Sequence, residues 1–490
     1  MATGGFDYLV LGGGVAGCVL AGRLTERNGL RVGLVEGGPD HGPGREGWPG
    51  GLRDARLLPR DEVWDGDGPP YRLRGKVLGG SSSVNGCWHT WGAPGDFAEW
   101  AALGGPHLCA GALEPYRLRA VRAMGLREVP DGELTAWATA SLAAAAELGY
   151  PEIADMAALG PPRGAGRPPI NAAGHERVNA AQAYLRRDRP GLEIMAGALA
   201  DRLVIERGRV TGVRVIRGGV AETLRAERYL LTAGTYGSPG VLLRSGVGPA
   251  DDLRRLGIEV ALDLPAVGAN LIDHPSRTLR LAPSPGLTAA LRAQEEADGL
   301  YPSQVAIKAG SAACPPGTWD LHLLPIAGAP LFGTLPPGHY EVGVTAFLMK
   351  PRSRGRVSIP SADPAAPPII EPGFLTDPGG HDRTALGDGL RLAGELAATG
   401  PLRTRASPAG PPSAAVGTYW HPVGTCAMGP GDSRDAVVDG HGKVHGLSGL
   451  WIADASIMPS IPRCNTQLPT LALAELLAEA FLGQRTSPGA

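Results

Sequence analysis

The fold class follows from one short segment, Tyr8-Leu9-Val10-Leu11-Gly12-Gly13-Gly14-Val15-Ala16-Gly17. Four residues typical of a buried parallel strand run directly into the pattern G-x-G-x-x-G, and a helical pattern continues from Cys18 to Thr25. Gly12 permits a tight turn, Gly14 lets the backbone approach a pyrophosphate, and Gly17 lets the helix pack closely on the strand. Phosphates would then lie at the helix N-terminus, where free N–H groups favour negative charge. The segment therefore predicts a dinucleotide site of the Rossmann type.

A second strand ends in an acid at the spacing that such a site requires. Residues 31–35 have the pattern of a buried strand, and Glu36 follows them, 19 residues after Gly17. A carboxylate about 20 residues beyond the glycine loop holds the ribose hydroxyls of a dinucleotide. An acid here favours FAD or NAD over NADP. The alternative interpretation is a plain glycine-rich turn between a strand and a helix.

Length and composition predict a globular chain of two domains. The 490 residues exceed one ordinary core, and contents of 43% hydrophobic and 19% charged residues are typical of folded proteins. The net charge of −2 gives no electrostatic basis for binding nucleic acid or an anionic membrane. Because no run of about 18 apolar residues occurs, no membrane span is expected.

The cysteines and the N-terminal segment predict a cytoplasmic location. Residues 1–7 lack the basic region of a secretory signal. The six cysteines show no C-x-x-C or metal-like spacing, so we interpret them as buried or free thiols in a reducing compartment. The eleven histidines form no H-E-x-x-H pattern, and no metal is expected.

A second block of small residues reads Gly75-Lys76-Val77-Leu78-Gly79-Gly80-Ser81-Ser82-Ser83-Val84-Asn85-Gly86. This composition suits neither a helix interior nor a core strand, and it leaves backbone N–H groups free to face a ligand. Asn85 adds a side chain that both donates and accepts hydrogen bonds. Taken alone, the block could equally be an ordinary loop.

The block resembles the first signature of the glucose–methanol–choline (GMC) oxidoreductase family, flavoproteins that oxidise alcohols. Further blocks resemble the same family in the same order, at residues 232–249, 263–275, 420–426 and 464–470. Gly240 stands where the family usually has Gln. The resemblance extends over essentially the whole chain and is thinnest between Ser276 and Thr418, where the family selects its substrate. The chain also resembles the short GMC proteins associated with mycofactocin, a peptide redox carrier.

The resemblance implies an α/β fold. It combines a Rossmann-like FAD-binding domain, built from discontinuous segments, with an α+β substrate domain that contains an antiparallel sheet. The implied FAD-binding segments are residues 1–95, 180–275 and 420–490, and the substrate segments are residues 96–179 and 276–419. The residue pattern itself predicts a hairpin from Asp201 to Val215 and a terminal helix from Leu471 to Phe481.

The cofactor that the resemblance implies is non-covalent FAD. Some family members attach FAD through a histidine in the Ser-Ser-x-Asn position, which Val84 occupies here. Asp454-Ala455 resembles the family segment that contacts the ribityl chain and the pyrophosphate, and the backbone at Ala200 would touch the adenine. The residues expected to bind the cofactor are Gly12, Gly14, Val15, Ala16, Gly17, Glu36, Gly79, Gly80, Ser82, Asn85, Ala200, Asp454 and Ala455.

The catalytic position of the family falls on His421, in Trp-His-Pro-x-Gly-Thr-Cys. Alcohol oxidation needs an acceptor for the hydroxyl proton, and imidazole suits this role because its unperturbed pKa is about 6.5. The family's second position, usually His or Asn, is Gln467 here. Three interpretations remain open: Gln467 binds the substrate hydroxyl, Asn465 substitutes for it, or His421 suffices alone. We favour the first, and we interpret His274 and His445 as structural.

The predicted function is FAD-dependent oxidation of a small-molecule alcohol to an aldehyde or ketone. Hydride would pass to flavin N5, and His421 would accept the proton. Two alternatives remain, namely a non-redox lyase that contains FAD, and a flavoenzyme of specialised metabolism with an unusual substrate or acceptor. The sequence leaves the electron acceptor open between oxygen, a quinone and a peptide redox carrier, and with it the choice between oxidase and dehydrogenase.

Overall fold

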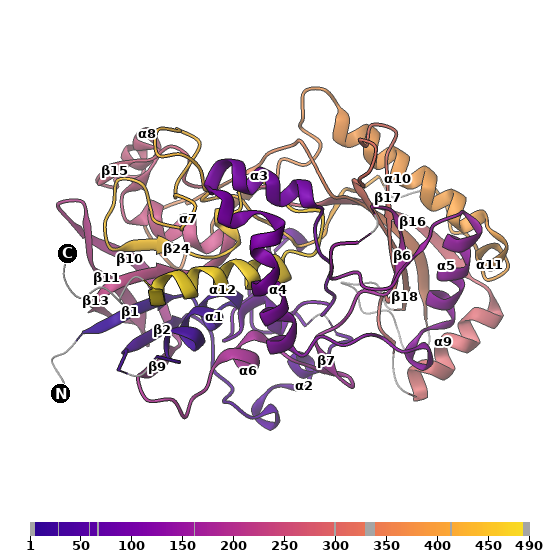
Figure 1. Cartoon of the computed structure of the whole chain (residues 1–490), viewed down its shortest axis with the longest axis horizontal. Helices are drawn as coiled ribbons and strands as arrows, with labels where there is room; N and C mark the ends of the chain where they lie inside the picture. Colours follow the sequence, from indigo (N-terminus) through magenta and orange to yellow (C-terminus); the bar gives the residue numbers. More distant parts are fainter. Residues whose placement is uncertain are drawn as a thin grey trace.

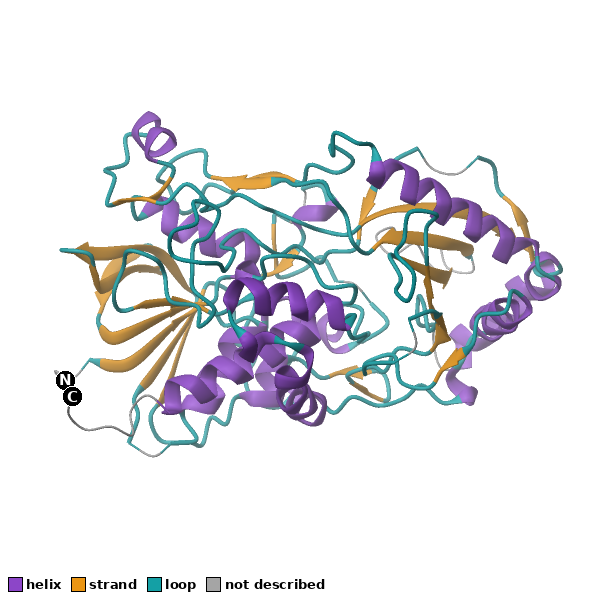
Figure 2. Cartoon of the chain, turned by 45° about the horizontal axis from the view of Figure 1, so that its top comes forward, coloured by secondary structure: helices purple, strands orange, loops and turns teal. Residues whose placement is uncertain are grey.

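The computed structural model describes residues 5–27, 29–57, 59–65, 68–160, 162–297, 300–328, 339–411 and 414–483. Two β-sheets lie at opposite ends of an elongated molecule, with helices and long loops between them (Figures 1 and 2). The fold is the predicted combination of a Rossmann-like α/β part and a part with an antiparallel sheet. No helix among the described residues is long and apolar enough to cross a membrane.

The first sheet is parallel and has five strands in the order β24-β13-β1-β2-β9. Its strands are β1 (Phe6–Leu11), β2 (Val32–Glu36), β9 (Leu192–Ala196), β13 (Ala226–Leu231) and β24 (Leu450–Ile452). Strand β1 lies at the centre, and residues 8–11 are fully buried, as expected for an apolar run covered on both faces. Helices α1 (Val15–Leu24), α4 (Ala110–Met124) and α12 (Gln467–Gly483) pack together beside this sheet (Figure 1).

The second sheet has eight strands in the order β22-β16-β19-β18-β17-β6-β5, and β23 also pairs with β16. The strands are β5 (Glu152–Ile153), β6 (Gly164–Gly166), β16 (Pro275–Pro283), β17 (Ala306–Ala309), β18 (Leu321–Gly328), β19 (Glu341–Leu348), β22 (Ala406–Pro408) and β23 (Gly417–Thr418). All of these pairings are antiparallel apart from the parallel β5–β6 pair. Helices α5 (Ala136–Glu147), α9 (Pro285–Ala297), α10 (His381–Ala398) and α11 (Gly400–Arg403) pack around this sheet.

The strands of the two sheets come from different stretches of sequence. The parallel sheet uses residues before 95, between 180 and 275, and after 420. The antiparallel sheet uses the intervening stretches, from β5 at Glu152 to β23 at Thr418, and its strand β16 starts at Pro275. The domain boundaries themselves stay a prediction, and parts of those ranges, such as residues 329–338, lie outside the described residues.

Three local predictions differ from the structure only at their ends. The predicted hairpin forms β10 (Ala198–Glu206) and β11 (Arg209–Arg217), which turn at Gly208 with φ of 73°. Helix α1 begins at Val15 rather than at Cys18. The prediction for the terminal helix was wrong at its start, because α12 begins at Gln467 and includes Pro469. Proline is tolerated there since the N–H groups of a first helical turn lack intrahelical acceptors.

Candidate active site

A cavity of about 790 Å³ lies between the two sheets. It extends from the glycine loop after β1 to the loop that carries His421, and β18 and β19 contribute Leu324 and Phe347 to its wall. The wall includes every predicted site residue apart from Gly17 and Gly79. Those two glycines, both within the described part of the chain, pack against backbone behind the wall: a Cβ on Gly17 would lie 1.9 Å from Gly12 O, and Gly79 N donates to Gly13 O at 2.7 Å.

The two glycine blocks meet at the nucleotide end of the cavity. Gly12 has φ of +117°, and a Cβ there would lie 2.5 Å from the carbonyl oxygen of Thr232. Gly80 has φ of +55°, and a Cβ there would lie 2.7 Å from the Cα of Gly14. Side chains at these positions would clash with the backbone, so glycine lets the two loops and the segment at Thr232 approach one another closely at the start of α1. Such a cradle of small residues at a helix N-terminus suits a pyrophosphate.

Glu36 ends β2 on the cavity wall and is 7% exposed. Its Oε2 accepts from Gly13 N at 2.8 Å, and its Oε1 accepts from Gly38 N at 2.7 Å. Burial raises the pKa of this carboxyl to about 7, although the two backbone hydrogen bonds act in the opposite direction. Each oxygen keeps a further lone pair, so the side chain fits the two hydroxyls of a ribose.

The remaining predicted cofactor residues surround the middle of the cavity. Asp454 is buried, accepts from Gly234 N at 2.9 Å and Ser238 Oγ at 2.6 Å, and so holds the first turn of α7 (Gly234–Arg244). Ser82 uses its hydroxyl within the protein, donating to Gly79 O at 2.6 Å and accepting from Ala180 N at 2.9 Å. Four predicted residues with apolar side chains also line the cavity, namely Val15, Ala16, Ala200 and Ala455. A glycine cradle with a buried acid at one end fits FAD.

His421 lies at the other end of the cavity and is 8% exposed. Its ring has two neighbours: Nδ1 lies 3.1 Å from Nδ1 of His274, and Nε2 lies 3.3 Å from Nδ2 of Asn465. Burial holds the pKa of His421 well below its usual range, and the cationic Arg74 adds to this effect. The imidazole is therefore neutral near pH 7 and able to accept a proton.

Backbone pairing brings His421 and His274 together. Strand β16 pairs with β23, and Tyr419 N donates to His274 O at 3.0 Å. The buried carboxylate of Asp273 accepts from the backbone N of His274 at 2.7 Å and from that of His421 at 2.9 Å. Trp420 takes the left-handed backbone conformation, with φ of 60°, between these contacts. The turn that carries His421 is thus fixed from both sides.

The structure separates the two candidate amides. Asn465 lies at His421, whereas Gln467 accepts a hydrogen bond through Oε1 from Nδ2 of Asn85. The Nε2 of Gln467 is buried and has no hydrogen-bond partner among the described residues. Asn465 is therefore the amide next to the imidazole, and Gln467 presents an unused donor in the cavity wall.

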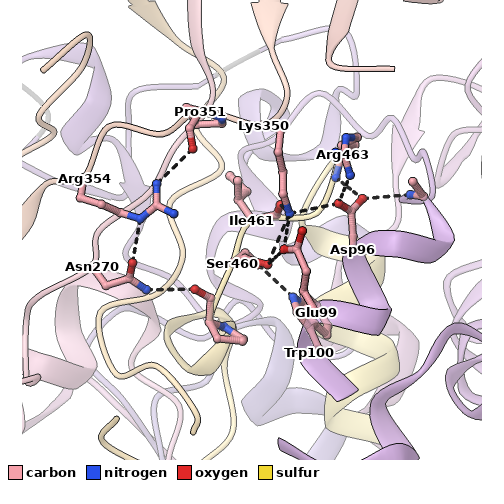
Figure 3. A network of polar contacts seen from close by, with 12 residues as sticks. Asp96, Glu99, Trp100, Asn270, Lys350, Pro351, Arg354, Ser460, Ile461 and Arg463 are labelled. Atoms are coloured by element: carbon pink, nitrogen blue, oxygen red, sulfur yellow. Dashed lines mark hydrogen bonds and ion pairs between the residues drawn. The ribbon is translucent and has the colours of Figure 1, made fainter. Parts of the chain in front are cut away.

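A charge network fixes the loop that carries Asn465 (Figure 3). Asp96 is fully buried and accepts from Arg463 N at 2.9 Å and from Lys350 Nζ at 3.1 Å. Lys350 Nζ also donates to Glu99 Oε2 at 2.7 Å, and Ser460 Oγ donates to the same oxygen at 2.6 Å. The network joins α3 (Pro94–Gly104), the end of β19 and the segment before Asn465.

Sequence reasoning missed several residues of the site. His274 was interpreted as structural, and Tyr419, Phe347 and Thr90 were not singled out. Tyr419 lies 4.1 Å from His421 and 3.8 Å from Phe347 between ring centroids. Residues 273–274 stand in one of the family-like blocks, which is the one signal that could have suggested His274.

The fold and the site together define a dinucleotide-dependent oxidoreductase with a buried histidine at the end of its cavity away from the glycine loop. Two family models described as GMC oxidoreductase match residues 6–276 and 351–474. The chain belongs to the GMC oxidoreductase family, and it is an FAD-dependent oxidoreductase that acts on CH–OH groups.

Its relatives cover nearly its whole length. The 5-(hydroxymethyl)furfural oxidase of Methylovorus sp. (strain MP688) is 34% identical over 98% of this chain and 99% of the relative. The oxygen-dependent choline dehydrogenase of Yersinia pestis is 32% identical over 98% of this chain and 94% of the relative. The crystal structure of pyridoxine 4-oxidase from Mesorbium loti has a TM-score of 0.83 and 26% identity, and the match covers 98% of this chain and 99% of that one.

Proposed function

We propose that this enzyme oxidises an alcohol to an aldehyde or ketone and that Nε2 of His421 accepts the hydroxyl proton. The observation that supports this most directly is the placement of a neutral, buried imidazole next to the Asn465 amide on the wall of the cavity. FAD, when bound, supplies the hydride acceptor at N5. The protein supplies the orientation of the substrate and the place for its proton.

Three groups would hold the substrate hydroxyl. The Nε2 of His421 accepts its proton, while the Nδ2 of Asn465 and the unpaired Nε2 of Gln467 are donors that suit the oxygen. The low exposure of His421 strengthens hydrogen bonds at this end of the cavity to an oxygen that gains negative charge. We therefore extend the favoured interpretation, in which Gln467 binds the substrate hydroxyl, to both amides. Asn465 is the amide next to the base.

The same residues predict a non-covalent cofactor and a small substrate. Backbone N–H groups of residues 12–17 and the carboxyl of Glu36 would hold the pyrophosphate and the ribose, and Val84 offers no nucleophile for a covalent link. Trp88, Phe347 and Tyr419 line the cavity, which suits an alcohol attached to a flat ring. The relative named for 5-(hydroxymethyl)furfural makes that alcohol the first candidate.

The test is anaerobic bleaching of the visible absorbance of the bound flavin by a panel of alcohols. The panel contains 5-(hydroxymethyl)furfural, benzyl alcohol, choline, a secondary alcohol and a sugar. We expect bleaching by at least one ring-bearing primary alcohol, and the recovery of colour in air then distinguishes an oxidase from a dehydrogenase. Absence of bleaching by every alcohol, in protein whose flavin dithionite does reduce, would contradict the proposal and favour a lyase.

A further inference from the structure

The orientation of the Asn465 amide is determined by Thr90. The hydroxyl oxygen of Thr90 accepts from the backbone N of Asn465 at 2.9 Å. The hydroxyl proton is donated to Oδ1 of Asn465 at 2.7 Å. Oδ1 of Asn465 therefore faces the Thr90 hydroxyl as its acceptor, and the NH₂ group faces Nε2 of His421 at 3.3 Å. Both ends of the amide are thus matched to their partners.

This orientation determines the tautomer of His421. The NH₂ group of an amide only donates, so Nε2 of His421, 3.3 Å from Nδ2 of Asn465, must carry the lone pair. The ring is neutral, since burial and nearby cations hold its pKa well below the usual range. Its single proton is therefore on Nδ1. In this tautomer the Nε2 lone pair, which accepts from Asn465 here, can take a proton from a substrate hydroxyl that replaces the amide as its partner.

The proton on Nδ1 of His421 needs an acceptor, and the atom within reach is Nδ1 of His274, at 3.1 Å. The rings meet edge to face, with centroids 5.3 Å apart and an interplanar angle of 89°. Nδ1 of His274 must then carry a lone pair, which places the proton of that ring on Nε2. Burial lowers the pKa of His274 to about 3, so this ring also stays neutral.

The charges around the pair favour two neutral rings. The positive charge of Arg74 lowers the pKa of His421, and the charges of Lys350 and Arg463 lower the pKa of His274. The nearby His322 is itself buried, and burial holds its pKa well below the usual range. The carboxylate of Asp273 accepts hydrogen bonds from the backbone N–H groups of His274 and His421 and from Thr418 Oγ1. Asp273 therefore fixes where the rings lie, and the acceptor for the ring proton comes from His274.

We propose that His274 is a positioning residue, which accepts the Nδ1 proton of His421 and so keeps the Nε2 lone pair of His421 directed at the substrate hydroxyl. This inference rests on the proposed function of His421. When His421 takes up the substrate proton, its Nδ1–H becomes a stronger donor, and the hydrogen bond to His274 stabilises the charged ring. Without that acceptor the ring proton would move to Nε2, and the enzyme would hold the unreactive tautomer.

The experiment compares His274→Leu with His274→Asn in the FAD-loaded enzyme. Leucine removes the acceptor, whereas the Oδ1 of asparagine lies at the same position along the side chain as Nδ1 of histidine. We expect the leucine variant to lose roughly 10²-fold in kcat with a much smaller change in KM, and the asparagine variant to recover most of that loss. His445→Leu and His445→Asn are the matched controls, because His445 bonds to Gly429 O outside the cavity.

A second readout does not depend on activity. In enzyme labelled with ¹⁵N-histidine, NMR separates protonated from unprotonated ring nitrogens, and the His421→Asn spectrum assigns the signals of His421. We expect protonated Nδ1 and unprotonated Nε2 in the wild type, and a population of the opposite tautomer in His274→Leu. A wild-type His421 protonated on Nε2 would overturn the proposal, even if the leucine variant fails to fold.

The two proposals fail in different ways. If no alcohol bleaches the wild-type flavin, the proposed function is wrong, whereas the NMR experiment still decides whether His274 sets the tautomer. If alcohols are oxidised but His274→Leu keeps the kcat and the pH profile of the wild type, the role of His274 is wrong and the proposed function stands.

Discussion

Asn85 donates a hydrogen bond from Nδ2 to Oε1 of Gln467, across 382 residues of sequence. The contact joins the second glycine block to the first turn of α12, and it orients the Gln467 amide with its NH₂ group unpaired. Asn465, two residues earlier, instead meets His421. The two amides of one motif thus have separate partners, and substitutions at each should have separable effects.

The first prediction concerns these amides. We expect Asn465→Ala to lower kcat/KM by about 10- to 100-fold, since it removes a donor beside the base and leaves Thr90 without its acceptor. Gln467→Ala should lower kcat/KM by less, about 10-fold, because this amide does not contact the base, although Asn85 Nδ2 also loses its acceptor. Steady-state kinetics with the best alcohol of the panel measures both. Wild-type kcat/KM in Gln467→Ala would exclude any contact between that amide and the substrate.

The second prediction concerns the base. His421→Asn should lower kcat by about 10²- to 10⁴-fold, because no other described residue on the wall at this end of the cavity is an imidazole or a carboxylate that could accept the proton. Flavin content should stay at the wild-type level, since the glycine loop and Glu36 are far from the substitution along the cavity. The measurements are single-turnover reduction and the ratio of visible to protein absorbance. A variant that retains wild-type kcat would remove His421 from the mechanism.

The third prediction concerns cofactor attachment. Acid precipitation should release all of the yellow colour into the supernatant, because Val84 stands at the position where a histidine would form a covalent link. Absorbance of the supernatant and of the redissolved pellet checks this directly. Flavin that stays with the pellet would show a covalent bond at some other residue.

The fourth prediction is a pH effect at Glu36 in the cofactor-free protein. Burial raises the pKa of this carboxyl from 4.5 to about 7 in the folded state, so between these values the folded protein binds more protons than the unfolded chain. The contribution of Glu36 to the free energy of unfolding therefore falls by roughly 3 kcal/mol as the pH rises from 4.5 to 7. Chemical unfolding at several pH values measures the slope, and Glu36→Gln should flatten it. An equal slope in both proteins would contradict the assignment.

The fifth prediction concerns the charge network of Figure 3. Asp96→Asn should destabilise the fold by about 3–5 kcal/mol, because it leaves Lys350 and Arg463 without their fully buried partner. It should also lower kcat by loosening the segment that carries Asn465. Thermal unfolding and kinetics test the two effects. Glu371→Gln is the control, since it breaks an exposed ion pair with Arg356 and should change neither quantity measurably.

Much of the nucleotide end was predictable because its signals are local. The turn at Gly12, the helix after it and the acid at Glu36 follow from backbone sterics and from spacing along a single strand–helix–strand unit. The hairpin around Gly208 follows from the same kind of rule. The start of α12 was placed too late, because a proline in a first helical turn resembles a helix boundary when only the sequence is considered.

The fold class, the glycine cradle and His421 as a candidate base could be predicted from the sequence, since the glycine loop is a local pattern and each block that resembles the family is short. The partners of that base depended on the tertiary structure. The pairing of β16 with β23 places His274 against His421, and the bond from Thr90 sets the amide of Asn465. These contacts join residues that are 147 and 375 positions apart, and their geometry follows from strand pairing and loop packing, for which the sequence carries no local pattern.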